Sequence, residues 1–284
     1  MSSVRDLIVE GRKRLEDVPL SEPALESRLL LRKAAGLTEG EVLASPERPV
    51  PARNARAFLG LIEKRRARAP LAYLTGEKEF WSRPFRVFPG VLIPRPETEL
   101  VVEKVIELST RGAESIVDVG TGCGAIAIAL AGELSSARII AVDISRRALK
   151  AARLNAASRF AGRVRFVEGS APAVFKGLIP RASQDFIVSN PPYVSEGEWK
   201  TLAPEIRLYE PKRALVPGPT GLEFIKKLIR GAAVFLRPQG YLVIEIGHGQ
   251  RDDVLALFDK TWESVRSFED LSAIPRVIVA RKRG

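Results

Sequence analysis

Hydrophobic residues in the first 75 positions recur at spacings of three and four, the period of an amphipathic helix. Ser21 before Pro23 is typical of a helix N-terminus, and Gly36 is typical of a helix C-terminus. The pattern predicts a small helical bundle over residues 1–75, which we expect to dock a substrate, with scaffolding as the alternative. The three apolar stripes are Val4, Leu7, Ile8 and Leu15; Ala24, Leu25, Leu29, Leu30, Ala34 and Ala35; and Ala57, Phe58, Leu61 and Ile62.

Residues 76–96 have a different pattern, in which aromatic and β-branched residues are interrupted by prolines. Because prolines are confined to the edges and turns of sheets, we expect a β-hairpin linker or two short edge strands. The following segment, Pro94–Glu99, is expected to open a helix that runs to about Leu108. The apolar positions of the linker are Phe80, Trp81, Phe85, Val87, Phe88, Val91 and Ile93.

From residue 115 onward, short apolar runs alternate with helical patterns. This alternation predicts an α/β domain over residues 97–284 with a mostly parallel, doubly wound sheet. Two final apolar stretches, Trp262–Phe268 and Val277–Ala280, are close enough in sequence for an antiparallel hairpin at the sheet edge. The expected strands are Ser115–Asp118, Arg138–Asp143, Arg163–Glu168, Asp185–Ser189 and Gly240–Ile246. The expected helices are Gly124–Leu134, Arg146–Ser158, Leu222–Val234 and Asp252–Phe258.

Composition narrows the classes of protein and of site. The chain of 284 residues has a formal net charge of +11, which suits an acidic or nucleic-acid-associated partner. One cysteine, Cys123, excludes an internal disulfide, and one histidine, His248, excludes a histidine-cluster metal site, so no metal is expected. The sequence contains no apolar run of 18 residues, and Met1–Glu10 lacks a signal-peptide pattern. We therefore expect a cytoplasmic protein with no membrane partner.

A glycine-rich turn follows the first expected strand of the α/β region. Gly120, Gly122 and Gly124 occupy alternate positions, whereas a dinucleotide-binding loop spaces its glycines G-x-G-x-x-G. Asp118 precedes the glycines, and its carboxylate would repel a pyrophosphate but would suit a cationic ligand. S-adenosylmethionine carries a sulfonium and an ammonium group and fits that requirement.

An acidic residue ends the next expected strand. Asp143 lies 19 residues after Gly124, where a carboxylate can accept hydrogen bonds from both ribose hydroxyls of an adenosine. A helix N-cap is the alternative role for this residue. The glycine turn and this acid together are shared with NAD-dependent enzymes, so they do not identify the cofactor.

A third motif, Asn190-Pro191-Pro192-Tyr193, follows the expected strand Asp185–Ser189. Two consecutive prolines end the strand, and its carboxyl end is where ligands bind in open α/β sheets. Asn190 offers a hydrogen-bond acceptor and Tyr193 offers a flat aromatic face, so this corner can hold a planar group that carries an NH2. A Pro-Pro loop with an asparagine cap is the alternative. Together with the glycine turn and Asp143, the corner indicates a methyltransferase that uses S-adenosylmethionine.

These residues together resemble the HemK/PrmC family of peptide chain release factor N5-glutamine methyltransferases. Pro94–Glu99 is the most family-specific stretch, whereas Asn190–Tyr193 is shared with enzymes that methylate adenine N6 or ribosomal-protein glutamine. The further matching segments are Leu74-Thr75-Gly76, Glu79-Phe80-Trp81, Asp118–Ala127, Ala141-Val142-Asp143, Glu210-Pro211, Ala214-Leu215 and Glu245-Ile246-Gly247.

The resemblance implies a class I (Rossmann-like) methyltransferase domain with a small N-terminal helical bundle and a β-hairpin linker. It implies methylation of the glutamine in the Gly-Gly-Gln loop of bacterial release factors, without stable binding of nucleic acid. Asn190, Pro191, Pro192 and Tyr193 would hold the glutamine amide. The residues implied to bind S-adenosylmethionine are Asp118, Gly120, Thr121, Gly122, Cys123, Gly124, Asp143, Ala171 and Asn190.

One pair of adjacent positions departs from the family pattern, and several other functions stay open. Ser170-Ala171 stand where the family often places an acid and an aromatic residue beside the adenine ring. The alternative functions are glutamine methylation of a ribosomal protein, adenine-N6 methylation of nucleic acid and a non-enzymatic scaffold for translation factors. A NAD-dependent oxidoreductase fits least, given the glycine spacing and Asp118.

Overall fold

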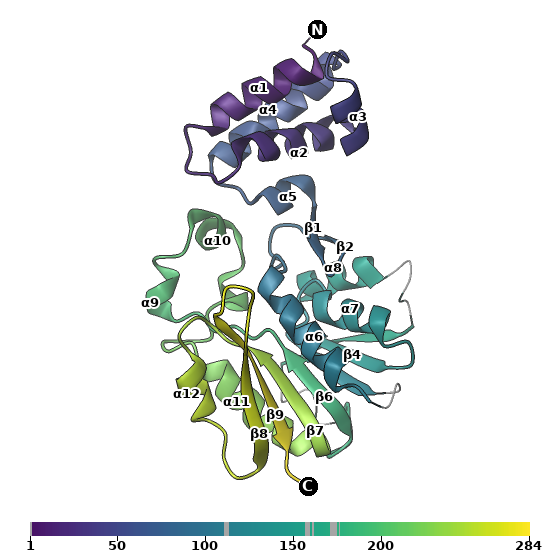
Figure 1. Cartoon of the computed structure of the whole chain (residues 1–284), viewed down its shortest axis with the longest axis vertical. Coiled ribbons are helices and arrows are strands. Elements are labelled where there is room, and N and C mark those ends of the chain that lie inside the picture. The colour runs from purple at the N-terminus through teal and green to yellow at the C-terminus, as the bar shows by residue number, and fades with distance from the viewer. Residues whose placement is uncertain (1, 111–113, 157–159, 161, 171–174, 176) are drawn as a thin grey trace. The chain divides into compact units, whose positions relative to one another are not determined.

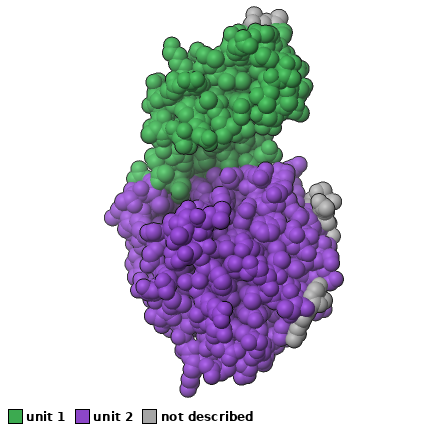
Figure 2. Space-filling model, viewed as in Figure 1, with its two compact units in different colours: residues 1–77, 203–209 green, residues 78–202, 210–284 purple. Residues whose placement is uncertain are grey.

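A computed structural model of the chain describes residues 2–110, 114–156, 160, 162–170, 175 and 177–284. The chain divides into two compact units, one comprising residues 1–77 with 203–209 and the other comprising residues 78–202 with 210–284 (Figure 2). Both units draw on more than one stretch of the sequence. The division expected from the sequence into residues 1–75, 76–96 and 97–284 stays a prediction.

The first unit is a bundle of short helices around one apolar core (Figure 1). Gly11 allows the first helix to pack closely, because a Cβ there would lie 2.4 Å from Ser27 Oγ and 2.5 Å from the Phe58 ring. The helices are α1 (Val4–Leu15), α2 (Pro23–Ala35), α3 (Glu39–Ala44), α4 (Ala52–Arg66) and α5 (Leu71–Thr75). Their shared core consists of Val4, Leu7, Leu15, Leu30, Leu31, Val42, Val50, Phe58 and Ile62.

Several helix ends in this unit follow local sequence signals, and one predicted cap is wrong. Ser3 and Thr38 form capping boxes with Asp6 and Glu41, which supply partners for the first backbone N–H groups of α1 and α3. Gly36 ends α2 in the left-handed region at φ 68°, as predicted. The predicted cap at Ser21 is wrong, because α2 has Glu22 at its N-cap position and no side chain caps it.

A helix from the second half of the sequence completes the first unit. Helix α10 (Pro204–Tyr209) is held there by ion pairs from α4 and the residues just after it. Arg65 Nη1 lies 3.0 Å from Glu205 Oε1, and Arg68 Nη2 lies 2.7 Å from Glu205 Oε2. No hydrophobic pattern predicted this association, because the pairing depends on charged residues about 140 positions apart.

The second unit contains a seven-stranded sheet in the order β5-β4-β3-β6-β7-β9-β8 (Figure 1). Strands β5, β4, β3, β6 and β7 are parallel, and β9 pairs antiparallel with both β7 and β8. The predicted doubly wound sheet is therefore present. Its strands are β3 (Ser115–Val119), β4 (Arg138–Asp143), β5 (Val164–Glu168), β6 (Gln184–Ser189), β7 (Leu236–Glu245), β8 (Trp262–Glu269) and β9 (Pro275–Lys282).

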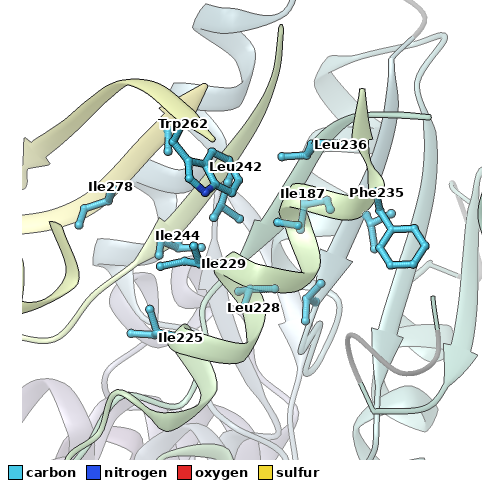
Figure 3. Close-up of a cluster of buried hydrophobic side chains, with 14 of the residues drawn as sticks. Ile187, Ile225, Leu228, Ile229, Phe235, Leu236, Leu242, Ile244, Trp262 and Ile278 are labelled. Carbon is cyan, nitrogen blue, oxygen red and sulfur yellow. The ribbon is translucent and has the colours of Figure 1, made fainter. Parts of the chain in front are cut away.

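Helices cover the sheet according to the alternation of its side chains. Val117 and Val119 point into a core shared with α11 and α12, which Figure 3 shows around Ile225, Leu228 and Ile229. Asp118 lies between these valines and points to the other face, where Ala127 of α7 contacts it. The helices of the unit are α6 (Glu99–Leu108), α7 (Ala125–Glu133), α8 (Arg146–Ala156), α9 (Glu196–Trp199), α11 (Glu223–Phe235) and α12 (Arg251–Leu255), with short 3₁₀ turns η1 (Pro96–Thr98) and η3 (Lys212–Ala214).

Strand β7 differs from the strand expected at Gly240–Ile246 in its start and in its register. Strand β7 begins at Leu236, directly after α11, and its register against β6 shifts between Gln184 and Phe186. Gly240 lies at this irregularity, where a Cβ would approach the Gln184 carbonyl oxygen to 2.9 Å. The predicted C-terminal hairpin is present, and β9 inserts between β7 and the edge strand β8.

The predicted linker hairpin consists of β1 (Glu77–Phe80) and β2 (Arg83–Arg86). Trp81 and Ser82 turn the chain with φ values of 51° and 53°, the sign that a type I′ hairpin turn requires at both central positions. The Glu99 carboxylate accepts a 2.6 Å hydrogen bond from Trp81 N and holds this turn against α6. Within the described residues, no helix is long and apolar enough to cross a lipid bilayer.

Candidate active site

The sequence motifs meet at the carboxyl ends of β3, β4 and β6. The chain proceeds from β3 outward to β4 and β5 and then returns to β6 on the other side of β3. This reversal is the position at which ligands bind in open α/β sheets. Val119 is in register with Ser189, and Ser189 Oγ donates a 2.7 Å hydrogen bond to the Val119 carbonyl oxygen. The register therefore brings the glycine turn and the Asn-Pro-Pro-Tyr corner to one edge.

The glycine turn forms an open backbone cradle. Gly120, Gly122 and Gly124 have φ values of 73°, 58° and 86°, which explains the requirement for glycine. A Cβ at Gly120 or Gly122 would meet no atom closer than 3.9 Å, so the space beside them is free for a ligand. A Cβ at Gly124 would instead lie 2.9 Å from Ile128 Cδ1 and 3.2 Å from Ala152 Cβ, so this glycine serves helix packing.

Asp118 lies at the base of the cradle and is fully buried. Its Oδ2 accepts hydrogen bonds from Thr121 Oγ1 at 2.6 Å and from Ala127 N at 3.2 Å. Its Oδ1 is buried and has no hydrogen-bond partner among the described residues. Burial raises the pKa of Asp118 to about 7, although the bond from Thr121 opposes the rise. A buried acceptor without a partner has a hydrogen bond to offer, and a cationic or amine-bearing ligand could supply the donor.

Asp143 ends β4 beside the same turn. Its Oδ2 accepts a 2.9 Å hydrogen bond from Gly122 N, and its Oδ1 accepts a 2.8 Å bond from Ser145 N. Burial raises the pKa of Asp143, whereas the bonds from Ser145 and Gly122 oppose that rise. The carboxylate therefore both braces the glycine turn and stands at the mouth of the cradle. The predicted alternative, capping of α8, belongs to Ser145 instead, because Ser145 Oγ accepts a 3.2 Å hydrogen bond from Ala148 N in the first turn of that helix.

The cradle fits S-adenosylmethionine on three observations. The open space at Gly120 and Gly122 allows a ligand to approach the backbone, the unpaired Oδ1 of Asp118 suits a positive group, and the Asp143 carboxylate suits hydroxyls. Ala171, which was predicted at the adenine ring, lies outside the described residues. Cys123 is buried, and burial raises the pKa of its thiol to about 12, so it stays a neutral thiol.

The Asn-Pro-Pro-Tyr corner is tied to two residues from distant parts of the unit. Asn190 Nδ2 donates a 2.8 Å hydrogen bond to Thr98 Oγ1 at the end of η1. Thr98 Oγ1 donates in turn to Glu245 Oε2 at 2.5 Å, and Tyr193 OH donates to Glu245 Oε1 at 3.0 Å. Glu245, the last residue of β7, therefore joins both polar residues of the motif.

This network is buried and contains one carboxylate. Thr98 is 3% exposed and Glu245 is 1% exposed. Burial raises the pKa of Glu245 to about 7, with hydrogen bonds from Thr98 and Tyr193 opposing the rise. Burial and the adjacent Glu245 also raise the pKa of the Tyr193 phenol, which therefore stays a hydrogen-bond donor. Sequence reasoning found Asn190 and Tyr193 but assigned no role to Glu245, since it lies 147 residues from Thr98.

Close packing fixes the backbone of Tyr193. Gln250 Nε2 donates a 2.8 Å hydrogen bond to the Tyr193 carbonyl oxygen, and Gln250 Oε1 accepts from Gly247 N at 2.9 Å. A Cβ at Gly221 would approach the Tyr193 carbonyl oxygen to 2.3 Å, so that position requires glycine. Sequence reasoning missed Gly221 and Gln250, because neither belongs to a recognisable pattern.

The Pro94–Glu99 segment is held by a second buried carboxylate. Glu210, whose side chain is 1% exposed, accepts a 3.1 Å hydrogen bond from Ile93 N and an ion pair from Arg95. This bond pair places η1, and with it Thr98, against the corner. Thr98 precedes α6, but its side chain makes no cap hydrogen bond there and instead bonds Asn190 and Glu245. His248, the only histidine, is exposed in the turn after β7.

Comparisons with known proteins agree with this arrangement. Residues 6–76 match the family model of the PrmC N-terminal domain, and residues 97–220 match that of the methyltransferase small domain. A methyltransferase structure from Pyrococcus furiosus has a TM-score of 0.52 at 20% sequence identity, covering 70% of this chain and 89% of that chain, and thus shares the fold.

Two curated relatives are similar over almost the whole sequence. The release factor glutamine methyltransferase of Nitratidesulfovibrio vulgaris is 39% identical over 99% of this chain and 96% of that protein. The protein of the same name from Moorella thermoacetica is 39% identical over 99% of both chains. At this identity and coverage, the chain belongs to the family of release factor glutamine methyltransferases.

Proposed function

We propose that this protein transfers a methyl group from S-adenosylmethionine to the side-chain amide nitrogen (N5) of a glutamine. The proposed substrate is the glutamine of the Gly-Gly-Gln loop in bacterial peptide chain release factors. Family membership supports the substrate class, and the orientation of Asn190 carries the chemical part of the proposal. Because Asn190 Nδ2 is bonded to Thr98, its Oδ1 faces away from that bond and has no partner among the described residues.

The proposed chemistry begins from a weak nucleophile. The lone pair of a carboxamide nitrogen is delocalised into its carbonyl group, so the nitrogen attacks a methyl group slowly. Asn190 Oδ1 and the Pro191 main-chain carbonyl oxygen would each accept one hydrogen of the substrate NH2. Two acceptors localise electron density on the nitrogen and stabilise the positive charge that develops during transfer. Pro192 keeps the turn rigid, so both acceptors are oriented before the substrate binds.

Tyr193 would pack against the face of the substrate amide. Its hydroxyl is bonded to Glu245 and its main chain is bonded to Gln250, so the ring is held at both ends. A general base is not required before transfer, because the nitrogen loses its proton only after positive charge has developed. The exposed position of His248 is compatible with this mechanism.

The cofactor would supply a methyl group activated by the sulfonium. Asp118 would accept a bond from its amino group, and Asp143 would accept bonds from its ribose hydroxyls. The backbone from Gly120 through Thr121, Gly122 and Cys123 to Gly124 would line its path. Ala171 would lie near the adenine, where its methyl group offers no aromatic stacking.

The remaining expectations complete the proposal. The helical unit would dock the release factor, and the protein would act in the cytoplasm without stable binding of nucleic acid. Its network of surface ion pairs, for example Arg14 with Glu10 and Glu63, gives the helical unit a mixed rather than a uniformly basic surface. A mixed surface suits a protein partner better than a phosphate backbone.

Methyl transfer from labelled S-adenosylmethionine to purified bacterial release factor tests the proposal. We expect label in the wild-type factor and none in a factor whose Gly-Gly-Gln glutamine is changed to alanine. Absence of label from the wild-type factor, with cofactor binding measured separately, would contradict the proposed substrate. Label in ribosomal protein or in adenine-containing nucleic acid would then identify one of the alternative functions.

A further inference from the structure

The buried hydrogen bonds from Asn190 through Thr98 to Glu245 run in one direction, each residue donating to the next. Its two links measure 2.8 Å and 2.5 Å, and the second carboxylate oxygen is occupied by Tyr193 OH at 3.0 Å. The participating residues come from three separate segments: η1, the corner after β6, and the end of β7. Such a network is assembled by the fold and is absent from any local stretch of sequence.

The direction follows from which groups can donate. An ionised carboxylate only accepts, so Glu245 must receive the hydrogen of the Thr98 hydroxyl. A hydroxyl has one hydrogen, so the Thr98 oxygen then has only lone pairs to offer to Asn190. The end of the Asn190 side chain that faces Thr98 must therefore be its NH2. The carbonyl oxygen of the same side chain is left at the opposite end.

This direction decides whether the corner can bind an amide NH2. The substrate nitrogen presents two hydrogens, and only an acceptor can bind them. With Asn190 rotated by half a turn, its own NH2 would face the substrate NH2, and no hydrogen bond would form. A neutral Glu245 allows that rotation, because its OH can donate to Thr98 and release the Thr98 hydrogen for Asn190 Oδ1.

Resting on the function proposed above, we propose that Thr98 and Glu245 are positioning residues that set the orientation of the Asn190 carboxamide through the ionised state of Glu245. Neither residue touches the substrate in this arrangement, and both act through Asn190. The ionised network presents an acceptor to the substrate, and the protonated network presents a donor.

The surroundings of Glu245 make its protonation accessible near neutral pH. Burial raises its pKa to about 7, Glu97 adds to the rise, and Arg276 on the neighbouring strand opposes it. Tyr193 faces the same carboxylate as a neutral phenol, with Arg95 and Arg276 acting on its charge. Activity should therefore fall as the pH decreases through about 7, when Glu245 takes up a proton.

The first test compares two variants of Thr98 in the full chain. Thr98→Val keeps the shape but removes the hydroxyl, and we expect kcat to fall by about 10- to 100-fold, since misorientation of one group has this size of effect. The KM for release factor and the Kd for S-adenosylmethionine should change less than about threefold, because neither involves the hydroxyl. Thr98→Ser restores the hydroxyl and should restore kcat to within about threefold of wild type. A wild-type kcat in Thr98→Val would overturn the proposal.

The second test is the pH profile of kcat at saturating cofactor, which removes the effect of Asp118 protonation on cofactor binding. Wild type should lose about tenfold in kcat for each pH unit below the pKa of Glu245. Glu245→Gln has no proton to take up, and its amide can face Thr98 with either end. Its kcat at pH 8 should be about two- to tenfold lower than wild type and should not fall further toward pH 5.5. An unchanged acid limb in Glu245→Gln would overturn the proposal.

A third measurement uses no substrate and separates this inference from the proposed function. The side-chain amide NMR resonances of Asn190, assigned by their loss in Asn190→Ala, report its orientation in the protein without cofactor. We expect them to shift with pH in wild type, with the midpoint of Glu245, and to remain constant in Glu245→Gln. A pH-independent wild-type signal contradicts the inference. If no release factor is methylated but the resonances shift as expected, the proposed function fails and the inference stands.

Discussion

Two buried carboxylate clusters, one in each unit, are stabilised in opposite ways. In the helical unit, Glu26 receives hydrogen bonds from Arg65 Nε at 2.5 Å and from Nη2 at 3.1 Å, and Arg65 also pairs with Glu205. Near the corner of the sheet, the Glu245 side chain receives hydrogen bonds, among the residues that the structure describes, only from the neutral hydroxyls of Thr98 and Tyr193. The first cluster balances charge with charge, whereas the second leaves a buried negative charge without a directly bonded cation.

Because of this difference, the cluster around Arg65 keeps its charges and serves the structure, whereas Glu245 can change its charge near neutral pH. Burial opposes the charged form of Arg65, but Glu26 and Glu205 outweigh it and raise the Arg65 pKa, so Arg65 keeps its positive charge at all ordinary pH values. Burial dominates at Glu245 and raises its pKa to about 7, so a small change in pH alters its charge. Perturbed groups of the second kind gather at functional sites, and Asp118 in the cradle is another example.

The two ends of the sheet repeat this contrast. Asp185, near the start of β6, accepts a hydrogen bond from Ser115 N at 2.8 Å and an ion pair from Arg237. Asp118 and Glu245, at the carboxyl ends of β3 and β7, have hydroxyl and amide donors instead. Within one sheet, Asp185 at the amino end of β6 is thus neutralised by Arg237, whereas Asp118 and Glu245 at the carboxyl ends of their strands have no arginine bonded to them among the described residues.

Removal of the arginine from the charged cluster should have the largest effect. Arg65→Met keeps the aliphatic volume but leaves Glu26 and Glu205 without their shared partner, and we expect a loss of about 3–5 kcal/mol in the stability of the helical unit. Hydrogen–deuterium exchange of α2 and α4 in the full chain measures this loss. The matched control is Arg66→Met, whose side chain is 39% exposed and whose ion pairs are worth about 0–1 kcal/mol. An equal loss of stability in Arg65→Met and Arg66→Met would contradict the idea that the buried ion pairs of Arg65 stabilise this unit.

Removal of Asn190, the half-buried end of the neutral cluster, should affect kcat more than stability. Asn190→Ala deletes one of the two proposed acceptors, and we expect kcat to fall by about 10²- to 10³-fold, the usual effect of losing one such group. Binding of S-adenosylmethionine, measured by calorimetry, should stay within a few-fold of wild type. Near-normal turnover in this variant would remove Asn190 from the mechanism.

Neutralisation of Glu245 should stabilise the fold at high pH. The folded-state pKa of about 7 lies above the ordinary value of 4.5, so the folded protein binds a proton more tightly than the unfolded chain. The contribution of Glu245 to the unfolding free energy should therefore be greatest below pH 4.5 and should decrease as the pH rises to 7, by about 3 kcal/mol in total. Glu245→Gln should lack this decrease. Denaturant unfolding of both proteins at pH 5 and pH 8 measures the difference, and parallel pH dependences would contradict it.

The smallest effect is expected at Cys123. Burial raises the pKa of its thiol to about 12, so it is neither charged nor nucleophilic at neutral pH. Cys123→Ala should keep kcat within about twofold and cost about 1 kcal/mol in stability, the usual size for a small change in packing. Turnover and thermal unfolding measure these two effects. A large loss of kcat would contradict the expectation, because it would give the Cys123 side chain a role in the reaction.

The features that sequence analysis predicted correctly are those that short segments determine. Alternating strands and helices, the glycine turn after the first strand of the sheet and the hairpin within residues 76–96 all follow from local patterns. The parallel sheet then brings Asp118, Asp143 and Asn190 to the same edge, because each lies within one residue of the carboxyl end of its strand. Ser21 was predicted wrongly as a helix cap because a suitable residue type does not ensure the cap geometry.

Other features required contacts between distant segments. Glu205 joins the helical unit through charged residues that lie 137 and 140 positions earlier in the chain, where no periodic pattern connects them. Gly221 and Gln250 hold Tyr193 through a close approach of backbone that is visible only after folding. Packing and charge balance of this kind depend on three-dimensional position and leave little trace in residue spacing.

The order of the elements and the class of fold were already contained in the spacing of apolar positions along the chain, and the spacing of glycine and acidic positions predicted a ligand site. Folding added the protonation state of Glu245 and the direction of the bonds that orient Asn190. A carboxylate has the same identity in any sequence, but its pKa depends on how fully water is excluded and on which partners surround it. Those partners come from η1, β6 and β7, and only the packed sheet brings them within hydrogen-bonding distance.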